Sequence, residues 1–552
     1  MGCCIGEDHK NWCKEYGIVY IDAEGKEYCI FHAPADCKFV ELYDEREGGD
    51  KPALMDAEQF NGMVFERIDA VIEAGVDEDR DKWDWPWNPR CNFAGTIFPY
   101  SISFNEYDGQ NDKYLPPINF RSAQFSDYAS FSSAQFSENA SFSSAQFSDY
   151  ADFISAQFSE NASFISSQFS GDADFSSSQF SKNAYFRSSQ FSGYASFSSS
   201  QFSKNAYFNN AEIQKQAEFT DVKFVKSSFD QMEFKGPVYF NNSIFEKDAS
   251  FRNAIFHEYS NFEQTKFKGE ADFHLAFFKE WSYFRNACFD KETTFAGAIS
   301  KETILLESVD LSNLKFAETN IESFKFIDCN WGDKRFAKIY DERHQTEDCN
   351  DTTLAEIYRR LKRIARESAD EEQTSHWHYR EKEMSRRTLS CVSLFQFWFT
   401  VTIAILMVLL SGWLLKTMHP PYYAILPSLI FLALPISLAK DEFKDKQHIS
   451  KLGSKIYLNI YRFISGYGEE PIRAFGVLLI LVALPFIIKF LVSLWTTTPM
   501  DWLKEAMWYM PLIKITLNDS QGYHDLFKGL SVTLITLQAA LFGFALRNKL
   551  RR

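Results

Sequence analysis

The sequence predicts an all-β solenoid followed by an α-helical transmembrane domain of four spans. Three observations lead to this fold class. Phenylalanine returns at alternating steps of five and six residues, giving seventeen of them from Phe120 to Phe208. A small residue stands two positions before most of these rings, as Ala134 does before Phe136. Towards the C-terminus, four apolar stretches are each long enough to cross a bilayer.

The phenylalanine period predicts stacked β structure in residues 91–331. Inward and outward side chains alternate over three residues, as they do in a strand. A segment with one large and one small inward side chain cannot bury its own face, so it must stack on its neighbours. An irregular insert at 105–119 is expected to form a loop. The inward core should contain Phe125, Phe131, Phe136, Phe142, Phe147, Phe153, Phe158 and Phe164.

The stretch Ala134-Gln135-Phe136-Ser137 through Phe142 resembles the pentapeptide-repeat family, in the variant where five-residue and six-residue steps alternate. The resemblance implies a right-handed quadrilateral β-helix in which about 22 residues complete a coil. It also implies that the phenylalanines stack in columns and that the sixth residue bulges at a corner. From Leu306 to Trp331 the step is strictly five, and the solenoid is expected to end there.

Some members of that family mimic duplex DNA and block topoisomerases, which requires a dense anionic surface. The whole chain has a formal net charge of −16, but residues 120–295 hold 21 Asp or Glu against 15 Lys or Arg, a net of −6. The acidic excess lies instead in residues 1–90, with 22 against 10. DNA mimicry is therefore the weakest functional hypothesis, and no direct nucleic-acid contact is expected.

The N-terminal cysteines predict a structural zinc site. Cys4, Cys13, Cys29 and His32 have the spacing C-x8-C-x15-C-x2-H, and three thiolates with one imidazole complete a tetrahedral site. The two-residue gap between Cys29 and His32 lets both side chains reach one metal. Competing ligands are Cys3, His9 and Cys37, and the alternative is a set of ordinary reduced cysteines.

The stretch from Tyr28 to His32 also resembles the short Cys/Cys/Cys/His knuckle that precedes the repeats in some bacterial members of the family. This resemblance implies a structural role. No apolar signal segment occurs in the first thirty residues, so the cysteines are expected in a reducing compartment. Gly6 stands where N-myristoylation requires Ser or Thr, which argues against acylation of Gly2.

Residues 1–90 are expected to cover the first coil, because an open solenoid end invites other chains to add to it. Within them, residues 57–74 have helical spacing, with apolar side chains at Phe60, Val64, Ile68 and Ile72. The acidic, tryptophan-bearing stretch 77–88 is expected to be a loop. After the solenoid, residues 332–390 form a basic connector, with two helices in residues 354–388 that break near 367–373.

The membrane domain is expected in residues 391–552. The spans are about 392–415, 422–439, 474–495 and 529–546, and Lys and Arg cluster before the first, between the second and third, and after the fourth. By the positive-inside rule both termini are cytoplasmic, which predicts a multi-pass protein of the bacterial inner membrane.

The last two spans resemble the two-span ion-channel domain that ends some bacterial pentapeptide-repeat membrane proteins, with a re-entrant segment at 502–516. A potassium filter of the T-x-G-Y-G-D type is absent between these spans, so potassium selectivity is not expected. Gly466-Tyr467-Gly468 is interpreted as a cytoplasmic turn. Lys489 and Lys514 are pore candidates, and the alternative is that both snorkel to the outer interface.

No motif of a phosphate-binding loop, zinc protease or serine hydrolase occurs, so an enzyme is not expected. The leading hypothesis is a bacterial inner-membrane protein whose cytosolic β-helix binds or senses a cytosolic protein. Its C-terminal domain would contact lipids as an anchor and, as a homo-oligomer, form an ion pore, by analogy with stress or phage-defence effectors. The alternative is a membrane-anchored scaffold without conductance.

Overall fold

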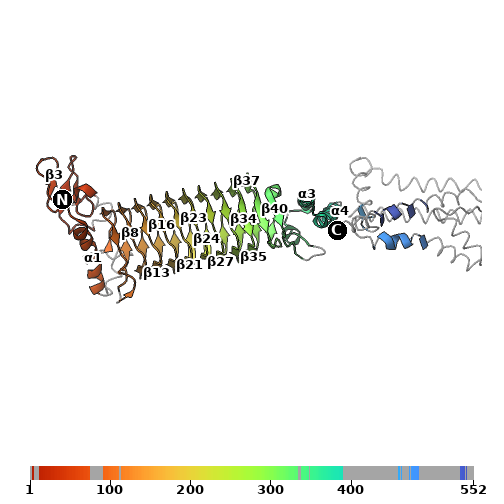
Figure 1. The fold of residues 1–552 in the computed structure, drawn as a ribbon, viewed down its shortest axis with the longest axis horizontal. Coiled ribbons are helices and arrows are strands. Elements are labelled where there is room, and N and C mark those ends of the chain that lie inside the picture. The colour runs from red at the N-terminus through yellow and green to blue at the C-terminus, as the bar shows by residue number, and fades with distance from the viewer. Residues whose placement is uncertain are drawn as a thin grey trace, which may run out of the picture. The chain divides into compact units, whose positions relative to one another are not determined.

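The computed structural model describes residues 3–4, 12–74, 91–110, 113–332, 337–346 and 349–388, together with short runs and single positions between 458 and 543. The chain divides into two compact units, residues 1–344 and 345–552. The first unit contains a small N-terminal cap and a long solenoid of short strands (Figure 1).

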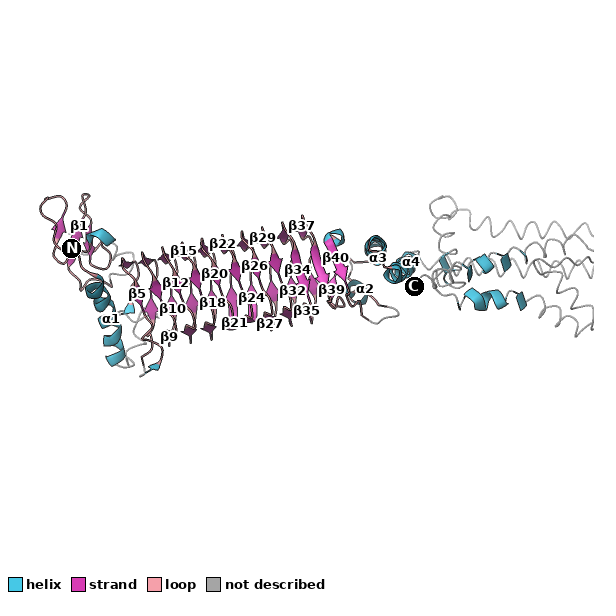
Figure 2. Cartoon of the chain, in the orientation of Figure 1, coloured by secondary structure: helices cyan, strands magenta, loops and turns pink. Residues whose placement is uncertain are grey.

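The solenoid has four faces, built from parallel strands that are mostly two residues long (Figure 2). Face 1 is a ten-stranded sheet of β4 (Ile97–Phe98), β7 (Gln124–Phe125), β11 (Gln146–Phe147), β15 (Gln168–Phe169), β19 (Gln190–Phe191), β22 (Glu212–Ile213), β25 (Glu233–Phe234), β29 (Ile255–Phe256), β33 (Phe277–Phe278) and β37 (Ile299–Ser300). Face 2 is an eleven-stranded sheet of β5 (Ile102–Ser103), β8 (Ala129–Ser130), β12 (Ala151–Asp152), β16 (Ala173–Asp174), β20 (Ala195–Ser196), β23 (Ala217–Glu218), β26 (Val238–Tyr239), β30 (Ser260–Asn261), β34 (Ser282–Arg285), β38 (Ile304–Glu307) and β40 (Phe324–Ile327).

Faces 3 and 4 share one sixteen-stranded sheet, because two of its strands run around the corner between them. Those two are β21 (Gln201–Tyr207) and β24 (Lys223–Ser228). Face 3 also holds β9 (Gln135–Phe136), β13 (Gln157–Phe158), β17 (Gln179–Phe180), β27 (Ile244–Phe245), β31 (Lys266–Phe267) and β35 (Cys288–Phe289). Face 4 also holds β6 (Ile118–Asn119), β10 (Ala140–Ser141), β14 (Ala162–Ser163), β18 (Ala184–Tyr185), β28 (Ala249–Ser250), β32 (Ala271–Asp272), β36 (Thr293–Thr294) and β39 (Leu314–Lys315).

The strand register confirms the predicted β-solenoid. Phe147 pairs with Phe169, so one coil uses 169 − 147 = 22 residues. Where the sequence takes three successive five-residue steps, from Phe219 to Phe234, one coil loses a residue. Phe224 then pairs with Phe245, 21 residues away. A register shift between Phe202 and Asn205, in the strand that pairs with β24, absorbs the difference.

The core of the solenoid consists of four columns of stacked phenylalanine rings. Phe142, Phe164 and Phe186 illustrate one column, with centroids 4.9 and 4.8 Å apart and planes within 2° of parallel. Rings of neighbouring columns meet edge to face, as Phe153 and Phe164 do at 5.3 Å. All eight phenylalanines expected in the core are at most 1 % exposed. Aromatic pairs in these geometries stabilise by about 0.5–1.5 kcal/mol beyond their buried area.

The first coil is covered by the cap. In the cap, β1 (Ile18–Ile21), β2 (Glu27–Cys29) and β3 (Tyr43–Asp44) form a three-stranded sheet, followed by α1 (Ala57–Ala74). The helix that the sequence predicts over 57–74 is confirmed. Its Phe60 and Phe65 rings lie edge-on against Phe98 and Phe104, at 6.0 and 5.6 Å, and so close two of the aromatic columns.

The backbone at the edge of the first coil is also hydrogen-bonded to the cap. The Ile97 N–H, at the open edge of β4, donates to the Phe31 carbonyl of the cap over 2.9 Å. At the position two residues after Ile97, each of the next four coils has a serine whose N–H donates to the previous coil, as Ser126 does to the Phe98 carbonyl. The first coil has Pro99 there, which lacks an N–H, so this position has no donor that needs a partner.

At the other end, α2 (Tyr340–Arg343) closes the last coil. The buried Asp341 carboxylate accepts from the Phe316 and Ala317 N–H groups over 2.8 and 2.9 Å. Burial raises the pKa of Asp341, while these two donors act in the opposite direction.

The second unit begins with a helical hairpin, α3 (Asp351–Glu367) and α4 (Glu371–Arg387), which confirms the two helices expected after the solenoid. Asn350 and Asp370 cap the helix N-termini. Arg359 and Lys362 of α3 both bind Glu381 of α4, so part of the basic run serves to hold the hairpin together.

The predicted spans at 392–415 and 422–439, the re-entrant segment 502–516, and Lys489 and Lys514 lie outside the described residues. The spans at 474–495 and 529–546 are described only in part. Within the described part of the chain, no helix has both the length and the apolar character needed to cross a membrane.

Replacing the buried Phe164 by aspartate is expected to lower the free energy of unfolding by about 4 kcal/mol or more, because it removes one ring from a column and buries an unpaired charge. The matched control is Ser159→Asp on the exposed surface, which should change stability by less than about 0.5 kcal/mol. Denaturant unfolding of both variants measures the difference, and equal losses would contradict the inward column.

Candidate metal centre

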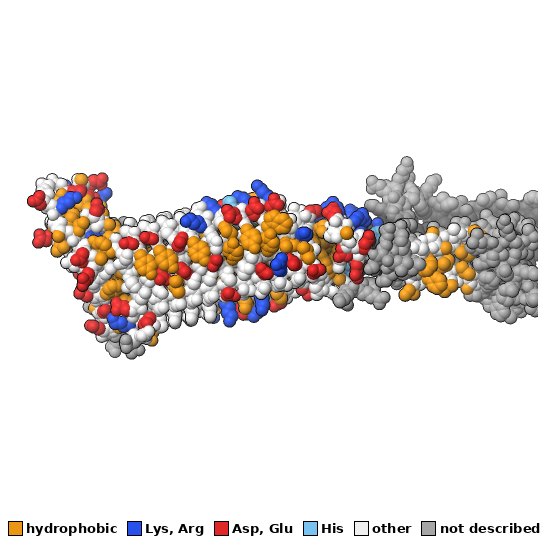
Figure 3. All heavy atoms as spheres, in the orientation of Figure 1, with side chains coloured by type: hydrophobic (Ala, Val, Ile, Leu, Met, Phe, Trp, Pro, Cys, Tyr) orange, Lys and Arg blue, Asp and Glu red, His pale blue; other side chains and the backbone are white. Residues whose placement is uncertain are grey.

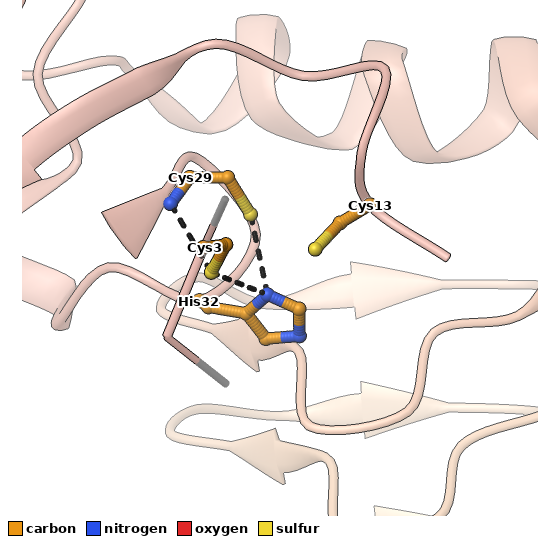
Figure 4. Close-up of side chains that lie close together, drawn as sticks. All are labelled: Cys3, Cys13, Cys29 and His32. Carbon is orange, nitrogen blue, oxygen red and sulfur yellow. Dashed lines mark hydrogen bonds between the residues drawn. The ribbon is translucent and has the colours of Figure 1, made fainter. Parts of the chain in front are cut away.

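Four side chains of the cap converge on one point: Cys3, Cys13, Cys29 and His32 (Figure 4). Their ligand atoms all lie within 4.8 Å of one another, and all four residues are buried. Cys29 ends β2, and His32 follows in the turn after it. Cys3 and Cys13 come from the two segments that precede the sheet.

The histidine is held in the orientation that a metal ligand needs. Its Nδ1 lies 3.3 Å from Cys3 Sγ and 3.2 Å from Cys29 Sγ. Its Nε2 lies 3.0 Å from the Ala94 carbonyl in the first coil. This carbonyl also accepts from the Trp12 indole over 3.0 Å. A backbone acceptor on the second ring nitrogen fixes the tautomer that leaves Nδ1 free to coordinate.

The close contacts within the cluster shift the pKa values of its side chains. Hydrogen bonds from Cys13 and Cys29 hold the pKa of Cys3 well below its usual range, while the same network raises the pKa of Cys13. Burial alone would lower the pKa of His32, but hydrogen bonds to Cys29 and Cys3 outweigh it and raise the pKa to about 9. The cluster therefore stabilises a thiolate, the form in which sulfur binds a metal.

The arrangement fits a small tetrahedral ion. With Zn–S near 2.3 Å and Zn–N near 2.0 Å, a tetrahedral site separates sulfur and nitrogen ligands by about 3.5 Å. The observed separations of 3.2 and 3.3 Å are close to this value. The Cys29 N–H also points at Cys3 Sγ over 3.5 Å, a donor that would stabilise a bound thiolate.

Three of the four ligands predicted from the sequence belong to the cluster, but Cys4 does not, and Cys3 takes its place. The Cys3 side chain is buried at the centre, whereas Cys4 is in a turn and does not belong to the cluster. Cys4 is partly buried, and burial raises the pKa of its thiol. Of the competing candidates, Cys37 packs with Tyr20 and Phe39 elsewhere in the cap, and His9 lies outside the described residues.

The segment that carries Cys13 is fixed by Arg67 of α1. This guanidinium lies 5.0 Å from the Trp12 ring centroid and 5.1 Å from that of Tyr16, and its Nη1 binds Glu15 at 2.5 Å. Arg67 is only 7 % exposed. Helix α1, the cysteine segment and the first coil are therefore joined around the centre, a role of Arg67 that no sequence motif indicates.

The family model of pentapeptide repeats (9 copies) matches residues 120–168, 153–201, 219–266 and 229–276. This part of the chain therefore consists of pentapeptide repeats. The family model does not extend to the cap or to the second unit. Neither curated proteins nor solved structures gave a match to the chain.

The two adjacent cysteines provide a direct test of the centre. Cys3→Ser should reduce bound metal in the purified chain to less than about half an equivalent, because a closed four-ligand site loses one thiolate. Cys4→Ser, the matched control, should keep the wild-type content. Elemental analysis of both variants makes the comparison, and metal loss in the Cys4 variant with retention in the Cys3 variant would contradict the structure.

Proposed function

We propose that the chain is a non-enzymatic, membrane-anchored scaffold, in which the solenoid presents a binding surface and a zinc-bound cap protects its free end. The observation that carries this proposal is the interior of the coils, which is filled by phenylalanine columns from the first coil to Phe295. A solenoid filled in this way offers its outer faces to a partner protein.

Zinc is the ion that suits the donor set. Three thiolates and one imidazole select a soft or borderline divalent ion, and four protein ligands leave no position for water or substrate. Cys3, Cys13, Cys29 and His32 would hold the ion, which would supply cross-linking energy and no catalysis. Because His32 and Trp12 both contact Ala94, the bound ion would tie the cap to the first coil.

The apolar C-terminal segments support an anchor. Residues 474–480 and 538–540 are helical, and Gln538 Nε2 donates to the Ala474 carbonyl over 2.7 Å. Phe475 and Phe542 also meet, with ring centroids 5.2 Å apart. Ile472, Leu479 and Ile480 are nevertheless 87, 51 and 63 % exposed. A helix pair that leaves large apolar side chains exposed is unfavourable in water but suits lipid.

The connector hairpin is linked to this C-terminal region within the second unit. The Glu383 carboxylate of α4 binds Arg386 of its own helix at 2.7 Å and Arg462 at 3.3 Å. Burial would raise the pKa of Glu383, but the neighbouring arginines outweigh it and keep the pKa below its usual value. These ion pairs would hold the hairpin to the C-terminal region.

Extraction of membranes from cells that express the full chain tests the anchor. The chain is expected to stay in the membrane pellet after alkaline carbonate treatment, since apolar spans resist it. A variant with the third apolar stretch interrupted by two aspartates, Leu478→Asp and Leu481→Asp, should be released more readily. Complete release of the wild-type chain would refute the anchor.

Ion flux from liposomes containing the purified chain separates the scaffold from the pore. The scaffold predicts no leak above that of empty liposomes, and no change on substitution of Lys489 or Lys514 by glutamine. A leak that either substitution alters would instead establish the predicted oligomeric pore.

A further inference from the structure

Face 1 of the solenoid changes its outward residues in the last three coils. From β7 to β25 the outward column is polar, and it consists of Gln124, Gln146, Gln168, Gln190, Glu212 and Glu233. In β29, β33 and β37 the same column holds Ile255, Phe277 and Ile299. The inward rings already hold the coils together, so the fold does not require apolar residues here.

Ile255 and Phe277 are half-buried, and the side chains at the end of the column are exposed. Ile299 is 60 % exposed, and Leu275, at the neighbouring corner, is 49 % exposed. Leu275 also has a φ of 57°, in the left-handed region that Ser, Asn and Asp occupy at most equivalent corners. A bulky apolar residue is unfavourable there for the isolated chain.

Two lysines flank the apolar column. Lys279 and Lys301 each place Nζ 5.9 Å from the Phe277 ring centroid. Other cations of the solenoid contact carboxylates: Lys235, Arg252, Lys268 and Arg285. Within the described residues neither Lys279 nor Lys301 has a carboxylate at ion-pair distance, although Lys279 Nζ reaches His257 Nδ1 over 2.6 Å. Basic side chains lie along the upper edge over these coils, with acidic side chains among them (Figure 3).

We propose that this surface, formed by Ile255, Leu275, Phe277, Ile299, Lys279 and Lys301, binds an acidic amphipathic segment of a partner protein. Apolar side chains of such a segment would cover the exposed column, and its carboxylates would pair with the two lysines. The polar column in the earlier coils of the same face lacks both features, so binding is confined to the end of the solenoid next to α2.

Selection of a random peptide display library on the full chain in detergent tests the surface. The test variant is Ile255→Gln/Phe277→Gln/Ile299→Gln, which restores the polar pattern of the earlier coils. The control variant is Gln146→Ser/Gln168→Ser/Gln190→Ser. Peptides enriched on the wild type should combine apolar residues with Asp or Glu and keep their affinity for the control. Their affinity for the test variant should fall at least tenfold, and for Lys279→Glu/Lys301→Glu as well.

No enrichment over the test variant, or enriched peptides without acidic residues, would overturn the proposal. Self-association of the chain that disappears in the test variant would assign the surface to a second copy instead. Binding to anionic vesicles lost in the same variant would assign it to lipid.

A second and independent observation concerns Lys38, a completely buried lysine in the cap. Its ammonium donates to the carbonyls of Ile30 and Phe31, the two residues between the ligands Cys29 and His32. It also lies 4.7 Å from the Phe60 ring centroid. No carboxylate of the described residues pairs with it, and burial lowers its pKa to about 7, against an opposing effect of Cys29 and Cys3.

A buried cation needs a nearby negative charge. Three thiolates around a divalent ion, with a neutral imidazole, leave one net negative charge on the centre. We infer that Lys38 is the counter-charge of the metal centre and makes it specific for a divalent ion. With a monovalent ion the centre would have two net negative charges, and Lys38 could balance only one of them. This inference rests on the zinc site proposed above.

Metal competition and proteolysis of the full chain test the role of Lys38. In Lys38→Met, zinc affinity measured with a competing chelator should fall ten- to a hundredfold. The exposed control Lys51→Met should match the wild type. In the metal-free chain Lys38→Met should instead stabilise the cap, because an uncompensated buried charge has been removed. Limited proteolysis within residues 12–74 should therefore be slower in this variant than in the wild type.

Unchanged zinc affinity in Lys38→Met would overturn the inference, and so would faster proteolysis of the metal-free variant, which would assign Lys38 to packing alone. Failure of the zinc proposal itself would be recognised separately, by the absence of bound metal in the wild-type chain.

Discussion

Stacking between coils is the interaction on which the rest of the structure depends. A strand of two residues has no stability of its own, and each coil is stabilised only by its two neighbours. The ring spacing in the phenylalanine columns, such as 4.8 Å between Phe147 and Phe169, equals the spacing of hydrogen-bonded strands. Backbone pairing and aromatic stacking are therefore satisfied by the same geometry, and a change to one coil affects only the coils beside it.

The first and last coils are the weakest parts of the solenoid, because each has a neighbouring coil on one side only. Other parts of the chain cover both of these ends. Phe31, Pro99 and the rings of α1 complete the first coil, and Asp341 completes the last. The candidate metal centre lies at the first of these ends and contacts the first coil through Ala94. A bound ion at this place would cross-link the cap to the first coil, as structural metals do in small domains.

The sequence predicts the solenoid well because its period is a direct consequence of stacking, and it places helix α1 because Phe60, Val64 and Ile68 share one face. It predicts the metal ligands less completely. Spacing identifies Cys29 and His32, but the choice between Cys3 and Cys4 depends on which of the two side chains the fold turns towards the centre. The buried Lys38 and Arg67 carry no motif, because their roles arise from contacts between distant segments. The apolar column from Ile255 to Ile299 is recognisable only once the register aligns it with the glutamines.

Hydrogen exchange along the solenoid of the intact chain tests the central claim most directly. If the coils are held by columns of stacked side chains that continue across Ile213 and are covered at both ends, amides between residues 120 and 295 should exchange slowly, and protection should fall only towards the first and last coils. A rapidly exchanging window in the middle of this range, with slower exchange on both sides, would show that the columns are not continuous and would contradict the structure described here.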